Sequence, residues 1–317
     1  MAPRRLRGPA TAGPWPGALA WGLPGGLPMP LLAGEPALDQ LLAPGELQAG
    51  QSGPVRWWRS GELAFGELDL PDGETDLTEA ARGAYAALFR ALADSGCPHP
   101  HRLWNYLPRI NADGGGLERY RQFNIGRQQA FLDAGRPAFE GAPAACALGR
   151  PDGGLSLRFL AGTAVPRPLE NPRQVPAWRY STRFGPRSPT FSRAALAPLA
   201  GGQVALWVSG TASIVGEESR HLGDLAAQVR ETVANLEAVL AVANAALRPA
   251  AGHAGLQLPG LAFTVYVRHA ADGPAALAHF AQALGAEPDC VLLQADICRA
   301  ELLVEIEAHG AVPGVLA

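Results

Sequence analysis

The stretch Asp289-Cys-Val-Leu-Leu-Gln-Ala-Asp-Ile-Cys-Arg-Ala-Glu-Leu-Leu-Val-Glu-Ile-Glu307 predicts the end of an α+β fold: a buried strand, a turn at Arg299-Ala300 and a second apolar strand. Because side chains alternate along a strand, Glu305 and Glu307 should share one face and Ile306 the other. A carboxylate in so apolar a run is costly unless it is neutralised, paired or used in chemistry. One of these acids is therefore a candidate proton donor; the alternative is an exposed strand face with two solvated glutamates.

Composition and charge bound the class of protein. The chain has 317 residues, of which 48% are hydrophobic and 17% charged, so it can bury a sizeable core. The net charge of −3 gives no basic footprint for nucleic acid or an anionic membrane surface, and no apolar run is long enough to span a bilayer. The four cysteines lack metal-ligand spacing and suit a reducing compartment. We expect a cytoplasmic protein that binds neither nucleic acid nor membrane and holds no metal.

The N-terminal fifty residues match no pattern that predicts a fold. The basic start, Met1-Ala-Pro-Arg-Arg-Leu-Arg7, is followed by prolines that interrupt the apolar stretch a signal peptide needs. We expect residues 1–50 to form a flexible leader and an N-terminal extension.

Two segments about 148 positions apart have the element order of one unit. In each, an aspartate suited to the N-cap, Asp76 or Asp224, begins a helical pattern, which is followed by a strand, a shorter helix and a closing strand pair. With a strand before each first helix, the order β-α-β-α-β-β predicts an α+β layer with helices on one face of a mixed sheet. The expected strands are 63–70, 103–110, 144–150 and 155–160 in a first unit spanning 51–165, and 203–209, 261–268, 290–297 and 300–306 in a second unit spanning 201–317.

The connection between the two units, residues 166–200, is rich in proline and arginine. Its fixed φ angles indicate an ordered, extended crossover that contributes to the site. Arg179, Arg183 and Arg187 recur there at a spacing of four, with Tyr180 among them. Because a planar guanidinium binds carboxylates through two parallel hydrogen bonds, the cluster predicts an anionic small-molecule ligand. The alternative is that these arginines form surface salt bridges.

Two further motifs offer polar groups to a ligand. The turn Ser209-Gly-Thr-Ala-Ser-Ile-Val-Gly216 follows a buried strand; Gly210 would let the backbone approach a ligand, and Thr211 offers a hydroxyl. A simple strand-exit turn explains this motif equally well, and it lacks phosphate-loop spacing. The first unit adds Arg127, close to Asn105 in the expected fold. No Ser/His/Asp set or HExxH motif is present.

Taken together, these segments resemble the chorismatase family. The resemblance runs in collinear order from about residue 55 to residue 310, and it implies two fused units of the reactive-intermediate deaminase (RidA-like) fold. Its strings are Arg102-Leu-Trp-Asn-Tyr-Leu-Pro-Arg-Ile-Asn, residues 116–127, residues 180–191, residues 210–216 with Glu218-Ser-Arg-His, residues 293–299 and Leu302-Leu-Val-Glu-Ile-Glu.

The resemblance implies cofactor-free cleavage of chorismate to pyruvate and 3-hydroxybenzoate. It gives Glu305 the role of general acid, which protonates the enolpyruvyl methylene and then stabilises the resulting cation. Cys298 and Gly210 resemble hydroxybenzoate-forming members, whereas diol-forming hydrolases tend to carry alanine at both positions; a mere core thiol remains an alternative for Cys298. The residues expected to bind substrate are Arg127, Tyr180, Arg183, Arg187, Thr211, Arg299 and Asn105.

Several alternatives stay open. The product could instead be the trans-dihydrodiol or 4-hydroxybenzoate, or the chain could be a non-catalytic small-molecule binder of the same fold. RidA-type imine deaminases carry an arginine just after the proline that opens the strand pair; here those places read Pro143-Ala-Ala and Pro288-Asp-Cys, which argues against imine hydrolysis. The sequence leaves the oligomeric state open between a monomer and a small homo-oligomer.

Overall fold

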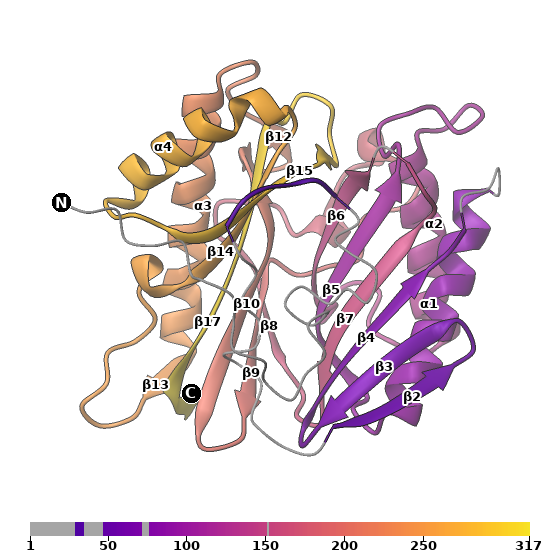
Figure 1. Ribbon diagram of the computed structural model, residues 1–317, viewed down its shortest axis with the longest axis horizontal. Coiled ribbons are helices and arrows are strands. Elements are labelled where there is room, and N and C mark those ends of the chain that lie inside the picture. Colours follow the sequence, from indigo (N-terminus) through magenta and orange to yellow (C-terminus); the bar gives the residue numbers. More distant parts are fainter. Residues whose placement is uncertain (1–28, 35–46, 72–75, 151) are drawn as a thin grey trace.

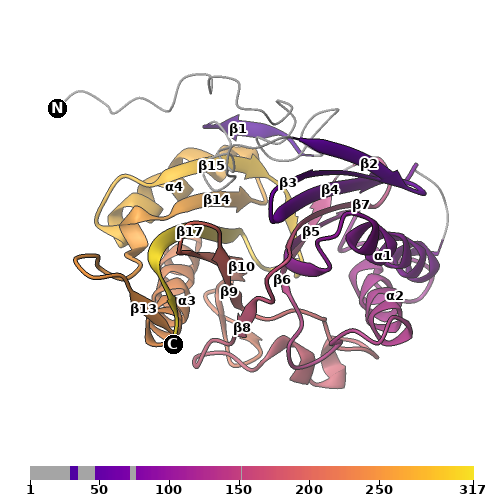
Figure 2. The same cartoon turned by 90° about the horizontal axis from the view of Figure 1, so that it is seen from below.

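The computed structural model describes residues 29–34, 47–71, 76–150 and 152–317. Two mixed β-sheets pack face to face in the middle of the molecule, and a pair of helices covers the outer face of each sheet (Figure 1). The view turned by 90° shows the same succession of helices, sheet, sheet and helices (Figure 2). The predicted α+β class is therefore confirmed.

The first sheet has the strand order β16-β6-β5-β7-β4-β3-β2, and helices α1 (Leu77–Asp94) and α2 (Arg119–Asp133) cover it. Only β16 comes from the second half of the chain. The strands are β2 (Gln48–Ser52), β3 (Val55–Ser60), β4 (Leu63–Asp69), β5 (His99–Pro108), β6 (Ala144–Arg150), β7 (Ser156–Gly162) and β16 (Asp296–Ile297).

The second sheet has the order β1-β15-β14-β17-β10-β9-β8, with β13 also paired to β17, and helices α3 (Leu225–Ala245) and α4 (Gly273–Leu284) cover it. A short hairpin of β11 (Ile214–Val215) and β12 (Glu218–Ser219) lies apart from both sheets. The strands of the second sheet are β1 (Leu31–Ala33), β8 (Arg167–Leu169), β9 (Ala194–Leu199), β10 (Gln203–Ala212), β13 (Leu247–Pro249), β14 (Ala262–Val267), β15 (Asp289–Gln294) and β17 (Val304–Leu316).

The two sheets repeat one topology, as the sequence predicted. The path β6-β5-β7-β4-β3-β2 in the first sheet corresponds to β15-β14-β17-β10-β9-β8 in the second. Both predicted N-caps are present: the carboxylate of Asp76 accepts from the Thr78 N–H, and that of Asp224 accepts from the Ala227 N–H, each at 2.9 Å.

The closing strands of each unit are not hydrogen-bonded to each other, so the expected strand pairs are wrong as pairs. β5 lies between β6 and β7, and β14 lies between β15 and β17. In each half, the helix that follows the central strand returns the chain for a parallel pairing, β5 with β6 and β14 with β15, which a tight turn cannot make. The expected strand 290–297 is also divided: β15 ends at Gln294, and β16 crosses to pair with β6 of the first sheet.

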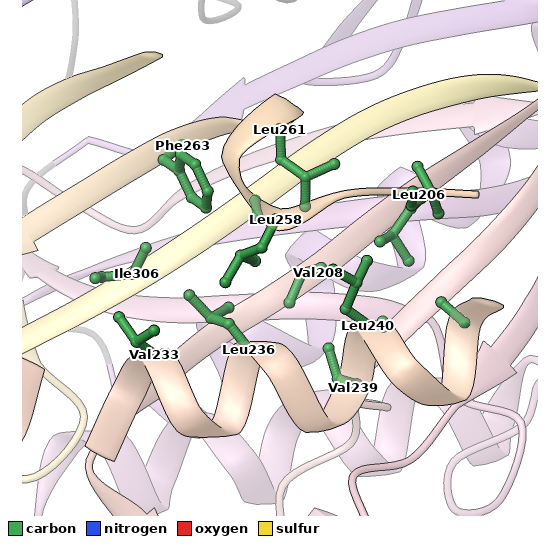
Figure 3. Packing of buried hydrophobic residues seen from close by; sticks show 14 of the residues in the cluster. Leu206, Val208, Val233, Leu236, Val239, Leu240, Leu258, Leu261, Phe263 and Ile306 are labelled. Atoms are coloured by element: carbon green, nitrogen blue, oxygen red, sulfur yellow. The ribbon is translucent and has the colours of Figure 1, made fainter. Parts of the chain in front are cut away.

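The two faces of β17 behave as strand alternation predicts. Val304, Ile306 and Ala308 pack toward the helices of the second half, where α3 contributes Val233, Leu236 and Leu240 (Figure 3). Glu305 and Glu307 point the other way, into the space between the two sheets, and both side chains are buried. The alternative of a solvated strand face is therefore wrong, because a second sheet covers this one.

The N-terminal expectation is only partly addressed, because residues 1–28 and 35–46 lie outside the described part of the chain. Within the first fifty residues, β1 pairs with β15 and the start of β2 pairs with β3. The Pro/Arg-rich connection contributes β8 and β9 to the second sheet, and residues 170–193 run between these strands. No helix in the ranges that the structure describes is long and apolar enough to cross a membrane.

Candidate active site

A cavity of about 300 Å³ is lined by residues from both halves of the chain. The first half supplies Tyr120 and Arg121 at the start of α2, and the connection between β8 and β9 supplies an aromatic and cationic wall. The second half supplies the end of β10, the loop that follows β16 and, on β17, Glu305. Of the predicted site residues, the cavity lining brings together Glu305, Cys298, Gly210, Tyr180, Arg183 and Arg299.

Glu305 places a carboxyl in the buried part of this cavity. The residue is only 3% exposed, and within the described ranges its carboxyl forms no hydrogen bond or ion pair. Burial, and next the nearby Glu307 carboxylate, raise the pKa of Glu305 to about 8, against smaller opposing effects of Arg102 and Arg193. Glu305 is therefore protonated at neutral pH and can act as an acid.

Glu307 lies on the same strand face but in a different environment. Its carboxylate is 2.7 Å from Nη2 of Arg102 and accepts a hydrogen bond of 3.0 Å from the indole N–H of Trp104. Both partners belong to β5 of the first sheet, so the contact links the two sheets. Glu307 does not line the cavity. The structure thus separates the two acids: Glu305 has no hydrogen-bond or ion-pair partner within the described ranges, whereas Glu307 belongs to a buried ion pair.

Gly210 lies directly against the carboxyl of Glu305. An added Cβ at this position would overlap Oε1 of Glu305, and it would lie 2.7 Å from Cδ of Glu305 and 3.1 Å from Cβ of Cys146. The backbone of Gly210 has no positive φ, so the requirement for glycine here is space and not backbone conformation. The absence of a side chain at Gly210 is what lets the Glu305 carboxyl occupy its present place.

The thiol of Cys298 faces the same cavity from the loop that follows β16. Burial, and next the Glu305 carboxyl, raise the pKa of Cys298 to about 12. At neutral pH the side chain is a neutral thiol, which limits it to packing and weak hydrogen bonding and makes it a poor nucleophile.

Of the four arginines that line the cavity, Arg121 pairs with Glu118 at 3.2 Å, and the other three give the cavity a cationic wall. Arg299 donates to the backbone oxygen of Glu217 at 2.9 Å, and its guanidinium lies 4.0 Å from the ring centroid of Phe184. Arg183, whose side chain is 56% exposed, forms ion pairs with Glu217 at 3.4 Å and with Glu218. Arg183 is exposed and Arg299 is half-buried, whereas the third arginine, Arg193, is buried.

Arg193 was not among the predicted site residues. Its Nη2 donates to the hydroxyl of Tyr180 at 2.7 Å and to the backbone oxygen of Val175 at 2.9 Å, while its buried Nε has no partner within the described ranges. Its charge reaches Glu305, whose pKa it lowers. Arg193 stands outside the four-residue spacing of the other arginines, and the only sequence signal was its membership of the same Pro/Arg-rich segment.

Four predicted binding residues lie outside the cavity lining. Arg127 is buried in the helix-side core of the first half, with its guanidinium 5.3 Å from the ring centroid of Tyr85. Asn105 is buried beside it and donates to the Cys146 backbone oxygen at 2.5 Å. Arg187 is exposed and donates to Gln128 at 3.2 Å, and the Thr211 hydroxyl donates to the Ser209 backbone oxygen at 2.8 Å.

The described part of the chain groups no three His, Cys, Asp or Glu side chains in a way that could hold a metal ion. The polar groups of the cavity include the protonated carboxyl of Glu305, one neutral thiol and several guanidinium groups, and the lining also holds Glu118, Glu301 and the hydroxyls of two tyrosines. This set can bind an anion and deliver a proton to it.

Comparison with known proteins identifies the family. A family described as chorismatase FkbO/Hyg5-like, N-terminal, matches residues 39–161. The chain is 38% identical over 283 residues to a 3-hydroxybenzoate synthase of Streptomyces hygroscopicus, covering 86% of this chain and 81% of that protein. It is 37% identical to a chorismatase of Streptomyces rapamycinicus, covering 84% and 79%. A crystal structure of a chorismatase, 32% identical, matches with a TM-score of 0.74 over 83% of this chain and 78% of that one. The chain therefore belongs to the chorismatase family.

Proposed function

We propose that this protein cleaves chorismate to pyruvate and 3-hydroxybenzoate. The observation that carries the proposal is the protonated carboxyl of Glu305, buried in a cavity whose walls hold Arg193, Arg183 and Arg299. Chorismate carries two carboxylates and an enolpyruvyl ether, so its cleavage needs cationic groups for binding and a strong acid at the ether.

The first chemical step is proton transfer from Glu305 to the terminal methylene of the enolpyruvyl group. A new C–H bond forms, the carbon–carbon double bond becomes a methyl-bearing oxocarbenium ion, and Glu305 becomes a carboxylate. That carboxylate lies where the positive charge develops and stabilises it electrostatically. The buried guanidinium of Arg193 is the cation best placed to hold the enolpyruvyl carboxylate, because this group must reach the inner part of the cavity where Glu305 lies.

The second step decides the product. Attack on the cation by the neighbouring ring hydroxyl of the substrate gives a cyclic ketal, and the proton of that hydroxyl restores the acid form of Glu305. Loss of a ring proton and cleavage of the C–O bond to the ring carbon that carried this hydroxyl then aromatise the ring and leave a hemiketal. Its collapse releases pyruvate and the phenolate, which takes up a proton in place of the one lost from the ring to give 3-hydroxybenzoate, without net consumption of water. Attack by water would give the dihydrodiol instead.

Two residues support the hydroxybenzoate product. Gly210 leaves the carboxyl of Glu305 free to lie against the backbone, and Cys298 contributes a neutral thiol that fills space beside it. Both shape the volume in which either the substrate hydroxyl or a water molecule must approach the cation. The 3-hydroxybenzoate synthase relative is consistent with this choice.

Incubation of the purified protein with chorismate tests the proposal. We expect pyruvate, measured with lactate dehydrogenase, and 3-hydroxybenzoate, identified by chromatography and mass spectrometry, with no label incorporated from H₂¹⁸O at the ring hydroxyl. Dihydrodiol in place of 3-hydroxybenzoate would assign the hydrolase reaction, 4-hydroxybenzoate the lyase reaction, and the absence of pyruvate a non-catalytic binder.

The Glu305→Gln variant tests the role of the acid. We expect turnover to fall by about 10²-fold or more, because the amide cannot donate the proton, while the fold is retained. Glu237→Gln is the matched control, since Glu237 is an exposed residue of α3 that does not line the cavity. Normal pyruvate release by Glu305→Gln would show that another group supplies the proton.

A further inference from the structure

The ion pair between Glu307 and Arg102 does not line the cavity, yet both of its side chains are buried and closely paired. Glu307 is 4% exposed and Arg102 is 2% exposed, and their charged groups lie 2.7 Å apart between the two sheets. A buried ion pair is weak evidence for stability, because desolvation of both charges offsets most of their attraction. The location of this pair, two residues along the strand from Glu305, points to a different role.

The geometry fixes the position of the Glu307 carboxylate. One oxygen lies 2.7 Å from Nη2 of Arg102 and the other accepts the indole N–H of Trp104, so one ion pair and one hydrogen bond hold this carboxylate in place. Side chains two residues apart on a strand project from the same face about 7 Å apart. Glu305 therefore lies beside a carboxylate that cannot turn away, and a second negative charge on Glu305 is disfavoured.

The other groups that face Glu305 do not replace this charge. Arg102 and Arg193 favour the ionised form of Glu305 and so act in the opposite direction. Burial raises the pKa of the neighbouring tyrosine and cysteine side chains, so they are neutral at pH 7. The titratable and charged groups packed around Glu305 are Glu307 on its own strand, Tyr266 on β14, Arg102 on β5, Cys146 on β6, and Arg193 and Cys298 from the loops. The cavity lining adds Glu118, Tyr120, Arg121, Tyr180, Arg183, Arg299 and Glu301, whose charges are not among those that act on Glu305.

We propose that Glu307 is a positioning residue whose fixed negative charge, oriented by Arg102 and Trp104, keeps the neighbouring Glu305 carboxyl protonated in the substrate-free protein. Glu305 delivers the proton, whereas Glu307 contacts no substrate and acts only through Glu305. The kinetic consequence of this inference rests on the proposed function, but the protonation state of Glu305 does not.

Direct titration of Glu305 tests the inference without any substrate. The full-length protein is labelled with ¹³C at the glutamate side-chain carboxyl carbon, and the Glu305 signal is assigned by its loss in Glu305→Gln. We expect Glu305 to titrate well above the usual glutamate range in the parent protein, and at least about one pH unit lower in Glu307→Gln, where the charge of Arg102 remains.

Glu67→Gln is the matched control. Glu67 is also buried and lies 2.5 Å from an arginine, Arg56, but its charge is not among those that act on Glu305. We expect this variant to leave the Glu305 midpoint in place. An unchanged midpoint in Glu307→Gln, or an equal shift in Glu67→Gln, would overturn the inference.

If Glu307→Gln does not fold, the double variant Arg102→Met with Glu307→Met removes both charges and replaces a buried pair by apolar side chains, a change that proteins often tolerate. The Glu305 midpoint should still fall, because Glu307 acts on Glu305 more strongly than Arg102 does. An unchanged or higher midpoint in a folded double variant would contradict the inference.

The pH profile of chorismate turnover supplies the second readout. In Glu307→Gln, the decline in kcat toward alkaline pH should begin at lower pH by the same shift that the titration gives. A shifted titration without any turnover in the parent protein would support the role of Glu307 and refute the proposed function. Turnover in the parent protein with coincident pH profiles for the parent and Glu307→Gln would support the proposed function and refute the role of Glu307.

Discussion

The carboxyl of Glu305 lies against the backbone of Gly210, in the space that a side-chain carbon at position 210 would need. β10 and β17 are antiparallel neighbours, and a register shift between Val208 and Thr211 places Gly210 at this irregularity. The position of the acid in the cavity is thus set as much by the missing side chain on β10 as by the strand that carries it.

Substitution Gly210→Ala should displace the Glu305 carboxyl. We expect kcat for pyruvate formation to fall by about tenfold or more, and unfolding to become easier by about 1–3 kcal/mol, which is typical of overpacking in a rigid core. Any remaining product should shift toward the dihydrodiol, since the space around the cation has changed. Steady-state kinetics, chromatography of products and urea denaturation measure the three effects.

Gly83→Ala is the control for this substitution. Gly83 lies inside α1, has no positive φ and has open space around an added Cβ. This change should leave activity intact and stabilise the helix by up to about 1 kcal/mol. Full activity with an unchanged product in Gly210→Ala would mean that Glu305 acts equally well from another rotamer, and the close approach would then have no functional meaning.

Substitution Cys298→Ala should change the product more than the rate. The thiol is neutral and lines the cavity beside Glu305, so its removal creates space for water without removing a catalytic proton. We expect a larger fraction of dihydrodiol at a kcat within about tenfold of the parent value. Cys290→Ala is the control, since Cys290 is also partly buried but lies on β15 away from the cavity. Identical product ratios in parent and Cys298→Ala would assign Cys298 to packing alone.

The faces and caps of the elements could be predicted from the sequence, but the strand order could not. Alternation along β17 placed Glu305 and Glu307 on one face, and the aspartates at 76 and 224 marked two helix starts. Periodicity reports which side of a strand is buried and not which strand lies beside it. The insertion of β5 between β6 and β7 was therefore missed, as was the crossing of β16 to the first sheet.

The residues of the site could likewise be predicted only in part. The family strings located Glu305, Cys298 and Gly210, which the structure brings into one cavity. Arg127 was expected at the site because arginines bind carboxylates, but it lies on α2 between Phe123 and Phe131 at helical spacing. That apolar stripe was a signal in the sequence for a position under aromatic rings. Arg193 had no comparable signal, because only the packing of the two halves brings it near Glu305.

Substitution Arg183→Met should weaken substrate binding with little effect on chemistry. Arg183 lies at the exposed side of the cavity, where its partners in the ligand-free protein are Glu217 and Glu218. A substrate carboxylate would exchange with these glutamates, so loss of the guanidinium should raise KM about tenfold and leave kcat nearly unchanged. Arg82→Met is the control, since Arg82 is similarly exposed and paired at 2.8 Å but lies on α1. An unchanged KM for Arg183→Met would remove this arginine from the binding site.

The stability of the folded protein should fall as pH rises through the titration of Glu305. The pKa of Glu305 is raised from 4.5 to about 8 by burial, so between these values the folded protein binds a proton that the unfolded chain has released. The free energy of unfolding should therefore decrease from pH 5 to pH 8, by an amount on the order of a few kcal/mol for this residue. Below about pH 4.5 both states are protonated and the full contribution is present, whereas above pH 8 it is lost.

Urea unfolding of two variants across this pH range checks the prediction. The free energy of unfolding should decrease less steeply with pH in Glu305→Gln, while the exposed Glu237→Gln should follow the parent curve. The contribution of Glu67, whose pKa burial raises to about 7, has the same sign and should persist in both variants. Parallel curves for the parent and Glu305→Gln would mean that Glu305 is ionised in the folded protein, and that the acid proposed for catalysis is not poised to give up a proton.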